Sequence, residues 1–265
     1  SIFLQRVSFR LAEAGQQAQF ILKFSGNDRT ESYIPANEHL TMQIAKQIYD
    51  IDAAASALVF FKDGEPAYIT KRFDVLESGK KLAVEDFATL AGKTKANAGS
   101  NFKYDYSYEE LGLLIQKNVP AWKVEIEKYF RIVLFNYVFS NGDAHLKNFS
   151  VIETEHGDFI LSPAYDLINT RLHINDNDFG LKKGLFADGF MSDTFKKQGH
   201  ASHKDFFEFA KRIGINESRI NILMNPFREQ KSLVKDITKR SFLTEESKKS
   251  YIQLYHEKLN YLNAE

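Results

Sequence analysis

The chain has 265 residues, with 35 basic and 35 acidic side chains and no cysteine. Its length predicts one or two domains, and a hydrophobic content of 43% excludes a disordered chain. Zero net charge excludes general polyanion binding by long-range attraction. The absence of cysteine excludes disulfides, thiol nucleophiles and zinc–thiolate sites, and it fits a reducing cytoplasm, the location we predict. No apolar run is long enough to span a membrane.

The first part of the chain is predicted to be rich in β-structure. Four short apolar runs bounded by turn residues predict two hairpins. These runs are residues 7–11, 20–24, 57–61 and 67–73. Between the hairpins, apolar residues recur every three or four positions from Leu40 to Ile48. This spacing predicts a helix with Asn37 as its N-cap.

Helical patterns predominate after residue 75. The predicted helices are residues 82–90, 108–114, 124–139, 204–212, 217–224 and 245–262, and two short strands are predicted at 149–153 and 159–162. The basic-rich stretch 228–258 is expected to be a solvated helical face. A small sheet with one helix, followed by a larger helical part, predicts an α+β fold of two lobes, residues 1–74 and 75–265.

The segment 140–150, which reads S-N-G-D-A-H-L-K-N-F-S, is predicted to carry the chemistry. Asp143 and Asn148 have the spacing D-x-x-x-x-N of a protein-kinase catalytic loop, in which the Asp accepts or orients a hydroxyl proton and the Asn oxygen holds Mg²⁺. Lys147 lies between them and can neutralise charge on a transferring phosphoryl group. Taken alone, the loop fits an ordinary Asn-Gly-Asp turn with solvated side chains equally well.

Three further residues complete the kinase pattern. Asp166 follows the predicted hairpin, where kinases place a second Mg²⁺-binding Asp; a turn cap after Pro163 is the alternative. Lys23 lies in an otherwise apolar strand, where an unpaired charge is costly, so we expect it to pair with Glu38 and to reach the nucleotide phosphates. A solvent-facing lysine and a glutamate that complements a helix dipole are the alternatives.

These residues resemble the HipA-like serine/threonine kinase toxins, in the order of that family and over nearly the whole chain. The motifs that carry the resemblance are residues 20–23, 37–46, 72–74, 103–104, 141–150 and 161–167. The resemblance implies Asp143 as the catalytic base, Asn148 and Asp166 as Mg²⁺ ligands, and Lys23 as the anchor of the ATP phosphates.

The resemblance also implies a hinge between the lobes at Arg72, Phe73 and Asp74, with backbone groups around Arg72 and Phe73 holding the adenine. His145 titrates near neutrality and is a base by type. We expect it instead to order the catalytic loop, and we assign it with the hinge residues to the cofactor-binding set.

Two departures from the family pattern stand out. The family's phosphate loop resembles S-I-x-G-x-Q-x-K, whereas residues 1–6 read S-I-F-L-Q-R, without the glycine. The serine of that loop is an autophosphorylation site in the family, which makes Ser1 the corresponding candidate. Family members often carry a further N-terminal subdomain of about a hundred residues, so we expect a short form with that subdomain on a separate chain or removed.

The predicted function is therefore an ATP- and Mg²⁺-dependent serine/threonine protein kinase. The resemblance implies a growth-arresting toxin that phosphorylates a translation-related protein such as an aminoacyl-tRNA synthetase. It also implies a helix-turn-helix antitoxin as partner, without direct sequence-specific binding of nucleic acid and without membrane association. The alternatives are a small-molecule kinase, and a catalytically weak module that acts by binding its antitoxin.

Overall fold

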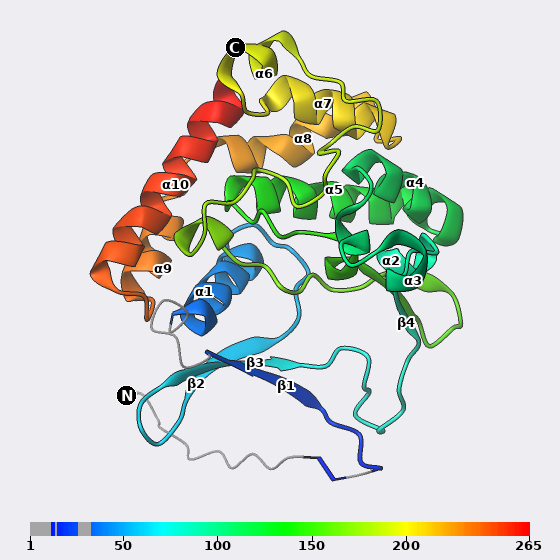
Figure 1. Ribbon diagram of the computed structural model, residues 1–265, viewed down its shortest axis with the longest axis vertical. Coiled ribbons are helices and arrows are strands. Elements are labelled where there is room, and N and C mark those ends of the chain that lie inside the picture. Colours follow the sequence, from blue (N-terminus) through cyan, green and yellow to red (C-terminus); the bar gives the residue numbers. More distant parts are fainter. Residues whose placement is uncertain (1–11, 14, 26–32) are drawn as a thin grey trace.

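Figure 1 shows a computed structural model of the protein, which describes residues 12–13, 15–25 and 33–265. A small sheet lies at one end and a larger helical part at the other. The predicted strand 7–11, Ser1 and the rest of the predicted phosphate loop lie outside the described residues. Among the described helices, none is both long enough and apolar enough to cross a membrane.

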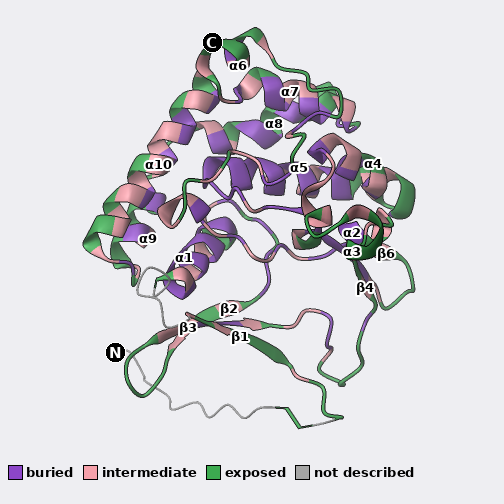
Figure 2. Ribbon diagram, in the orientation of Figure 1, coloured by how far each residue is buried: buried purple, intermediate pink, exposed green. Residues whose placement is uncertain are grey.

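The small sheet has three antiparallel strands in the order β1-β3-β2. They are β1 Phe20–Phe24, β2 Ser56–Phe60 and β3 Pro66–Lys71. The predicted hairpin between β2 and β3 is confirmed, and Gly64 in its turn has φ 92°, which suits glycine. β1 is a largely exposed edge strand (Figure 2), and Lys23 is the least exposed of its five residues.

Helix α1, Ile34–Gln47, packs on β2 and β3 through its buried face. The prediction that Asn37 caps this helix is wrong, because the helix starts three residues earlier, with Pro35 in its first turn. Asn37 is buried instead. Its amide nitrogen donates to the backbone oxygen of Asn169 at 2.8 Å, and its amide oxygen accepts from the Asn169 backbone N–H at 3.2 Å. This reciprocal pair ties α1 to the segment that follows Asp166.

A second antiparallel sheet lies against the helical part. Its strands, in spatial order, are β4 Val84–Asp86, β5 Ser150–Glu153 and β6 Phe159–Leu161. The hairpin of β5 and β6 confirms the sequence prediction. The helix predicted at 82–90 is wrong in its first half: the chain forms β4 there, then the short helix α2, Phe87–Leu90, whose N-cap Asp86 accepts from the Thr89 N–H at 2.8 Å. The segment forms a strand because it pairs with β5, which lies far along the chain.

The helical part is organised around α5, Trp122–Val138, which packs against α4, α8, α10 and β6 (Figures 1 and 2). The α-helices around it are α3 Lys95–Ala98, α4 Tyr108–Asn118, α6 Asp193–Gln198, α7 His203–Arg212, α8 Glu217–Arg228, α9 Ser232–Arg240 and α10 Glu245–Asn263. The 3₁₀ helices are η1 Phe102–Tyr104, η2 Leu146–Asn148 and η3 Thr170–Leu172. Helices α3 and α6 were not predicted, because both are short, whereas α9 lies within the stretch 228–258 that was expected to be helical. The predicted division between residues 74 and 75 falls in the connection from β3 to β4 and remains a prediction.

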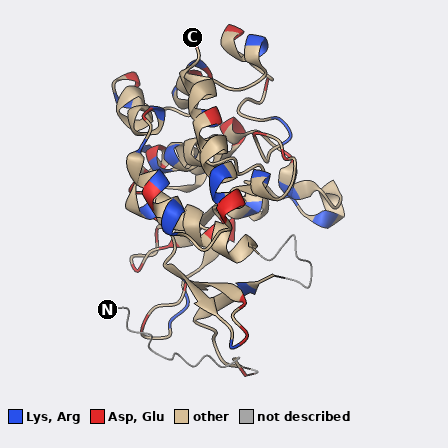
Figure 3. Cartoon of the chain, turned by 90° about the vertical axis from the view of Figure 1, so that its left-hand side faces the viewer, with Lys and Arg blue, Asp and Glu red and all other residues tan. Residues whose placement is uncertain are grey.

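The charged side chains of the stretch 228–258 are exposed or partly exposed, as expected of a solvated face, with one exception. On the face that Figure 3 shows, basic and acidic residues are interspersed over the helices. The exception is Lys258 of α10, whose side chain is 0% exposed and forms an ion pair with Asp178. His200 Nδ1 lies 2.6 Å from the other Asp178 oxygen, and the ring centroid of Tyr137 lies 4.5 Å from the ammonium group. The prediction of a solvated face is wrong at this residue, because tertiary packing supplies a buried partner.

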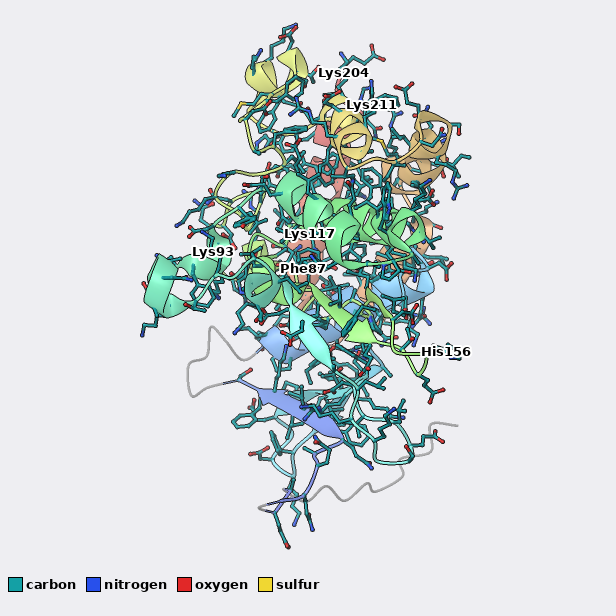
Figure 4. All side chains as sticks on the ribbon, turned by 90° about the vertical axis from the view of Figure 1, so that its right-hand side faces the viewer. Phe87, Lys93, Lys117, His156, Lys204 and Lys211 are labelled. Carbon is teal, nitrogen blue, oxygen red and sulfur yellow. The ribbon has the colours of Figure 1, made fainter. Side chains whose placement is uncertain are left out.

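We expect Lys258→Met to lower the free energy of unfolding by about 3–5 kcal/mol, because it leaves the Asp178 carboxylate buried without its cation. Urea denaturation measures this loss. The matched control is Lys211→Met in α7, at the residue labelled in Figure 4, whose exposed ion pair with Glu217 should not contribute measurably. Equal stability of the two variants would contradict the assignment.

Candidate active site

The loop between α5 and β5 is held by close backbone packing. A Cβ atom on Gly142 would lie 2.4 Å from the backbone oxygen of Asn177, and one on Gly180 would lie 2.7 Å from the backbone nitrogen of Ala144. Only glycine permits these approaches. The Gly142 N–H also donates to Thr170 Oγ1 at 2.9 Å. The loop is therefore clamped by the segment that follows Asp166.

Asp143 projects from this loop with its side chain 48% exposed. One carboxylate oxygen, Oδ1, accepts a hydrogen bond from the Tyr104 hydroxyl at 2.8 Å. The other, Oδ2, lies 4.0 Å from His145 Nε2. A fixed, half-exposed carboxylate of this kind suits a group that accepts or orients the proton of a substrate hydroxyl.

His145 is buried behind the loop and orders it. Its backbone N–H donates to Asn148 Oδ1 at 3.0 Å, and its Nε2 lies 2.8 Å from the ammonium of Lys103. Burial lowers the pKa of His145, with the Lys103 charge acting in the same direction and Asp143 opposing it. A neutral imidazole that accepts from Lys103 fits the predicted ordering role. Its assignment to nucleotide binding remains a prediction.

Lys23 joins the sheet end of the molecule to the helical part. Its ammonium lies 2.7 Å from Glu38 Oε1 in α1 and forms a second ion pair with Asp166 Oδ1, 143 residues away in sequence. Asn148 Nδ2 donates to the other Asp166 oxygen at 3.1 Å. The structure thus brings together four of the predicted site residues in one hydrogen-bonded network.

Two carboxylates share one ammonium in this network, and the pKa values follow from that imbalance. Burial alone would lower the pKa of Lys23, but the charges of Glu38 and Asp166 outweigh it and raise this pKa well above its ordinary value. Burial raises the pKa of Glu38 to about 7, with the Asp166 charge adding to the effect and Lys23 opposing it. The lysine is therefore firmly charged, while the buried glutamate takes up a proton easily.

The donor set of the site suits a hard cation. Asp166, 40% exposed, offers a carboxylate, and the Asn148 amide oxygen keeps a second lone pair beside its bond to His145. Mg²⁺ is usually held by one or two such oxygens, with phosphates and water completing the coordination. Asp166 has φ 55°, a left-handed conformation that is uncommon outside glycine, and this conformation aims its carboxylate at Lys23 and Asn148.

The predicted hinge residues lie in the connection after β3. Arg72 donates to both oxygens of Asp74, at 2.9 and 2.5 Å, and this hydrogen bonding lowers the pKa of Asp74. The ring of Phe73 lies 5.7 Å from that of Tyr165, next to Asp166. The Arg72 N–H donates to the Gln19 backbone oxygen at 2.9 Å, and the Asp74 backbone oxygen accepts from the Leu82 N–H at 2.8 Å. The binding of adenine by backbone groups of this segment remains a prediction.

Lys147 is the predicted residue that stands apart. Its side chain is exposed, and within the described part of the chain no partner is found for its ammonium group. Its backbone is fixed, since the Tyr165 hydroxyl donates to the Lys147 oxygen at 2.8 Å. The structure therefore presents Lys147 as a charge on an ordered loop that remains open to a ligand.

Sequence reasoning missed two sets of site residues. Asn141 links the loop to Asp166: its Nδ2 lies 3.3 Å from the Asp166 backbone oxygen, and its Oδ1 accepts from the Asp143 N–H at 3.3 Å. Lys103 and Tyr104 belong to a matched motif, but no role was assigned to them. Their position in sequence, far before the loop, gives no hint that they contact it.

The chain is similar to a known protein family and to named relatives. The family model of the HipA-like C-terminal domain matches residues 4–235. The chain belongs to this family. A relative from Haemophilus influenzae named "Putative kinase" is 27% identical over 261 residues, which are 94% of this chain and 75% of the relative. "Putative kinase Y4dM" of Sinorhizobium fredii is 31% identical over 159 residues, 56% of this chain and 37% of that protein.

Two solved structures share the fold. HipA of Shewanella oneidensis, in its complex with HipB and operator DNA, matches with a TM-score of 0.69 and 18% identity over 94% of this chain and 58% of its own. The kinase CtkA of Helicobacter pylori matches with a TM-score of 0.61 and 15% identity over 92% of this chain and 87% of its own. The predicted α+β, kinase-like fold is confirmed, and the chain spans just over half of the HipA chain it matches.

The raised pKa of Glu38 predicts a pH dependence of stability. From the ordinary value of 4.5 up to about 7, the folded chain keeps a proton that the unfolded chain releases, so the free energy of unfolding should fall as pH rises through this window. At ~1.4 kcal/mol per pKa unit the fall is on the order of 3 kcal/mol. Glu38→Gln should abolish it.

Urea denaturation at about pH 5 and about pH 8 measures the slope. Glu65→Gln, at the exposed β2–β3 turn, is the matched control and should keep the slope of the unmodified chain. If Glu38→Gln kept it as well, the titrating group would lie elsewhere.

Proposed function

We propose that the chain is an ATP- and Mg²⁺-dependent protein kinase that phosphorylates serine or threonine hydroxyls. The observation that carries the proposal is the convergence of Lys23, Glu38, Asn148 and Asp166 beside the half-exposed Asp143. Phosphoryl transfer asks for positioning and charge stabilisation rather than covalent chemistry. This set supplies a cation for phosphates, two oxygen ligands for a metal ion and a carboxylate for the attacking hydroxyl.

In this mechanism Asp166 and Asn148 would hold Mg²⁺, which would neutralise charge on the phosphates. Lys23, still held by Glu38, turns its charge to the phosphates. Asp143 orients the substrate hydroxyl and takes its proton as the new oxygen–phosphorus bond forms and the bond from the γ-phosphorus to ADP breaks. Lys147, exposed and free of described partners, can face the transferring group.

A protein substrate is favoured over a small molecule by the exposure of Asp143. Its side chain is 48% exposed, and Oδ2 receives no hydrogen bond from any described residue. A small-molecule kinase would instead be expected to enclose its substrate beside this carboxylate. The described site contains a lysine, two metal-ligand candidates and a carboxylate for the hydroxyl, and this combination argues for catalysis rather than for a module that only binds.

The toxin role is part of the proposal. The similar HipA structure is a complex with HipB and operator DNA, which supports a helix-turn-helix antitoxin as partner of this chain. We further propose a translation-related target, such as an aminoacyl-tRNA synthetase, and a separate protein that corresponds to the N-terminal subdomain. With zero net charge, the chain is expected to contact DNA through its partner.

We expect Asp143→Asn to lower label transfer from γ-labelled ATP to lysate proteins by about 10²–10⁴-fold, because the amide cannot accept the hydroxyl proton. Phosphoamino-acid analysis should find label on serine or threonine. Asp63→Asn, at the exposed β2–β3 turn, is the matched control. Wild-type protein that transfers no label, or an Asp143→Asn variant within tenfold of wild type, would refute the catalytic proposal.

Asp166→Asn should nearly abolish transfer at the Mg²⁺ concentration that saturates the wild type, through loss of the metal ligand, and the remaining activity should need a much higher Mg²⁺ concentration. Titration of Mg²⁺ after chelation measures this. Asp63→Asn should keep the wild-type requirement for Mg²⁺. An Asp166→Asn variant with a wild-type Mg²⁺ titration curve would show that the cation binds elsewhere.

A further inference from the structure

Tyr104 contacts the carboxylate of Asp143 from a segment much earlier in the chain. It closes η1, 39 residues before Asp143, and its hydroxyl donates to Asp143 Oδ1 at 2.8 Å. Lys103, its neighbour in η1, lies 4.8 Å from the Tyr104 ring centroid and 2.8 Å from His145 Nε2. Two successive residues of η1 therefore contact two residues of the catalytic loop.

The hydroxyl of Tyr104 is placed by its own scaffold rather than by Asp143. The Tyr104 backbone oxygen accepts from the Lys182 N–H at 2.9 Å, and the Lys182 ammonium lies 2.8 Å from Asp105. The Tyr104 ring meets the His145 ring edge-to-face at 5.3 Å. Because the ring contacts His145 and the Lys103 ammonium and its backbone is anchored by Lys182, the hydroxyl is a fixed donor for the carboxylate.

Another tyrosine fixes the loop backbone relative to the Tyr104 hydroxyl. The Tyr108 hydroxyl donates to the backbone oxygen of Ala144, the residue after Asp143, at 2.7 Å. The chain between the two tyrosines is anchored too, since the Lys183 N–H donates to the backbone oxygen of Tyr106 at 3.3 Å. Backbone and carboxylate of Asp143 are thus positioned from the same segment of the chain.

A carboxylate that is half exposed can rotate about its last torsion, which is broad. A hydrogen bond to a charged acceptor is among the stronger ones in proteins. With Oδ1 bound to Tyr104, rotation is restricted, and Oδ2 is left without a described donor. We infer that Tyr104 is a positioning residue for Asp143: it holds Oδ1 so that Oδ2 faces the incoming hydroxyl. This inference rests on the proposed kinase function.

The kinetic test uses the full chain with Tyr104→Phe, which removes only the hydroxyl. Initial rates of label transfer to a fixed amount of cell lysate are measured as the ATP concentration varies. The apparent kcat should fall about ten- to a hundredfold through misorientation of the base, with an unchanged KM for ATP. Melting temperature should not change. Tyr106→Phe is the matched control, because no described hydrogen bond involves its hydroxyl and it lies in the same segment.

Measuring Asp143→Asn in the same series distinguishes failure of the positioning role of Tyr104 from failure of the proposed kinase activity. If wild type transfers no label, the kinase proposal fails. If wild type is active and Asp143→Asn is not, but Tyr104→Phe equals Tyr106→Phe, only the inference fails. A faster Tyr104→Phe variant would overturn it as well, since the tyrosine would then block the carboxylate that a substrate must reach. A raised KM for ATP with unchanged kcat would likewise contradict it.

Discussion

One ammonium group, that of Lys23, is shared by two carboxylates from segments that are far apart in the sequence. Glu38 contributes one from the helix that packs on the small sheet, and Asp166 contributes the other from the end of the second sheet. Charges this close to the protein interior are costly unless they are paired. The ion pairs thus stabilise the contact between the small-sheet end and the helical part. A surplus carboxylate also leaves the site ready to accept a cation.

Around this contact the polar side chains serve to hold backbone in place. Asn37 pairs reciprocally with the backbone of Asn169, Asn141 connects the catalytic loop to Asp166, and glycines at two positions let the segments pack without side chains between them. Hydrogen-bonded networks in a low-dielectric setting rigidify a site. A rigid arrangement is what phosphoryl transfer requires, because most of its acceleration comes from positioning and electrostatics.

Much of the fold could be predicted from local pattern. The hairpin of β2 and β3, the hairpin of β5 and β6, and the long helix α5 all follow from apolar periodicity and turn residues, which depend on near neighbours. The failures share a cause. β4 was predicted as helix because its partner β5 is remote, Asn37 was predicted as a cap because its partner Asn169 is remote, and Lys258 was predicted as solvated because Asp178 is remote. A local pattern carries no information about such partners.

For the site, the sequence by itself determined which chemical groups are available: a D-x-x-x-x-N loop, a following Asp, a lysine in a strand and a glutamate in the next helix. Spacing and residue type suffice for that, because the loop chemistry is encoded within a few residues. Only the tertiary structure decided how these groups meet. It placed Lys23 between two carboxylates, left Lys147 without a described partner and brought Tyr104 to Asp143. The physical reason is that ion pairs and hydrogen bonds act over a few ångströms in space, and only the folded chain sets those distances.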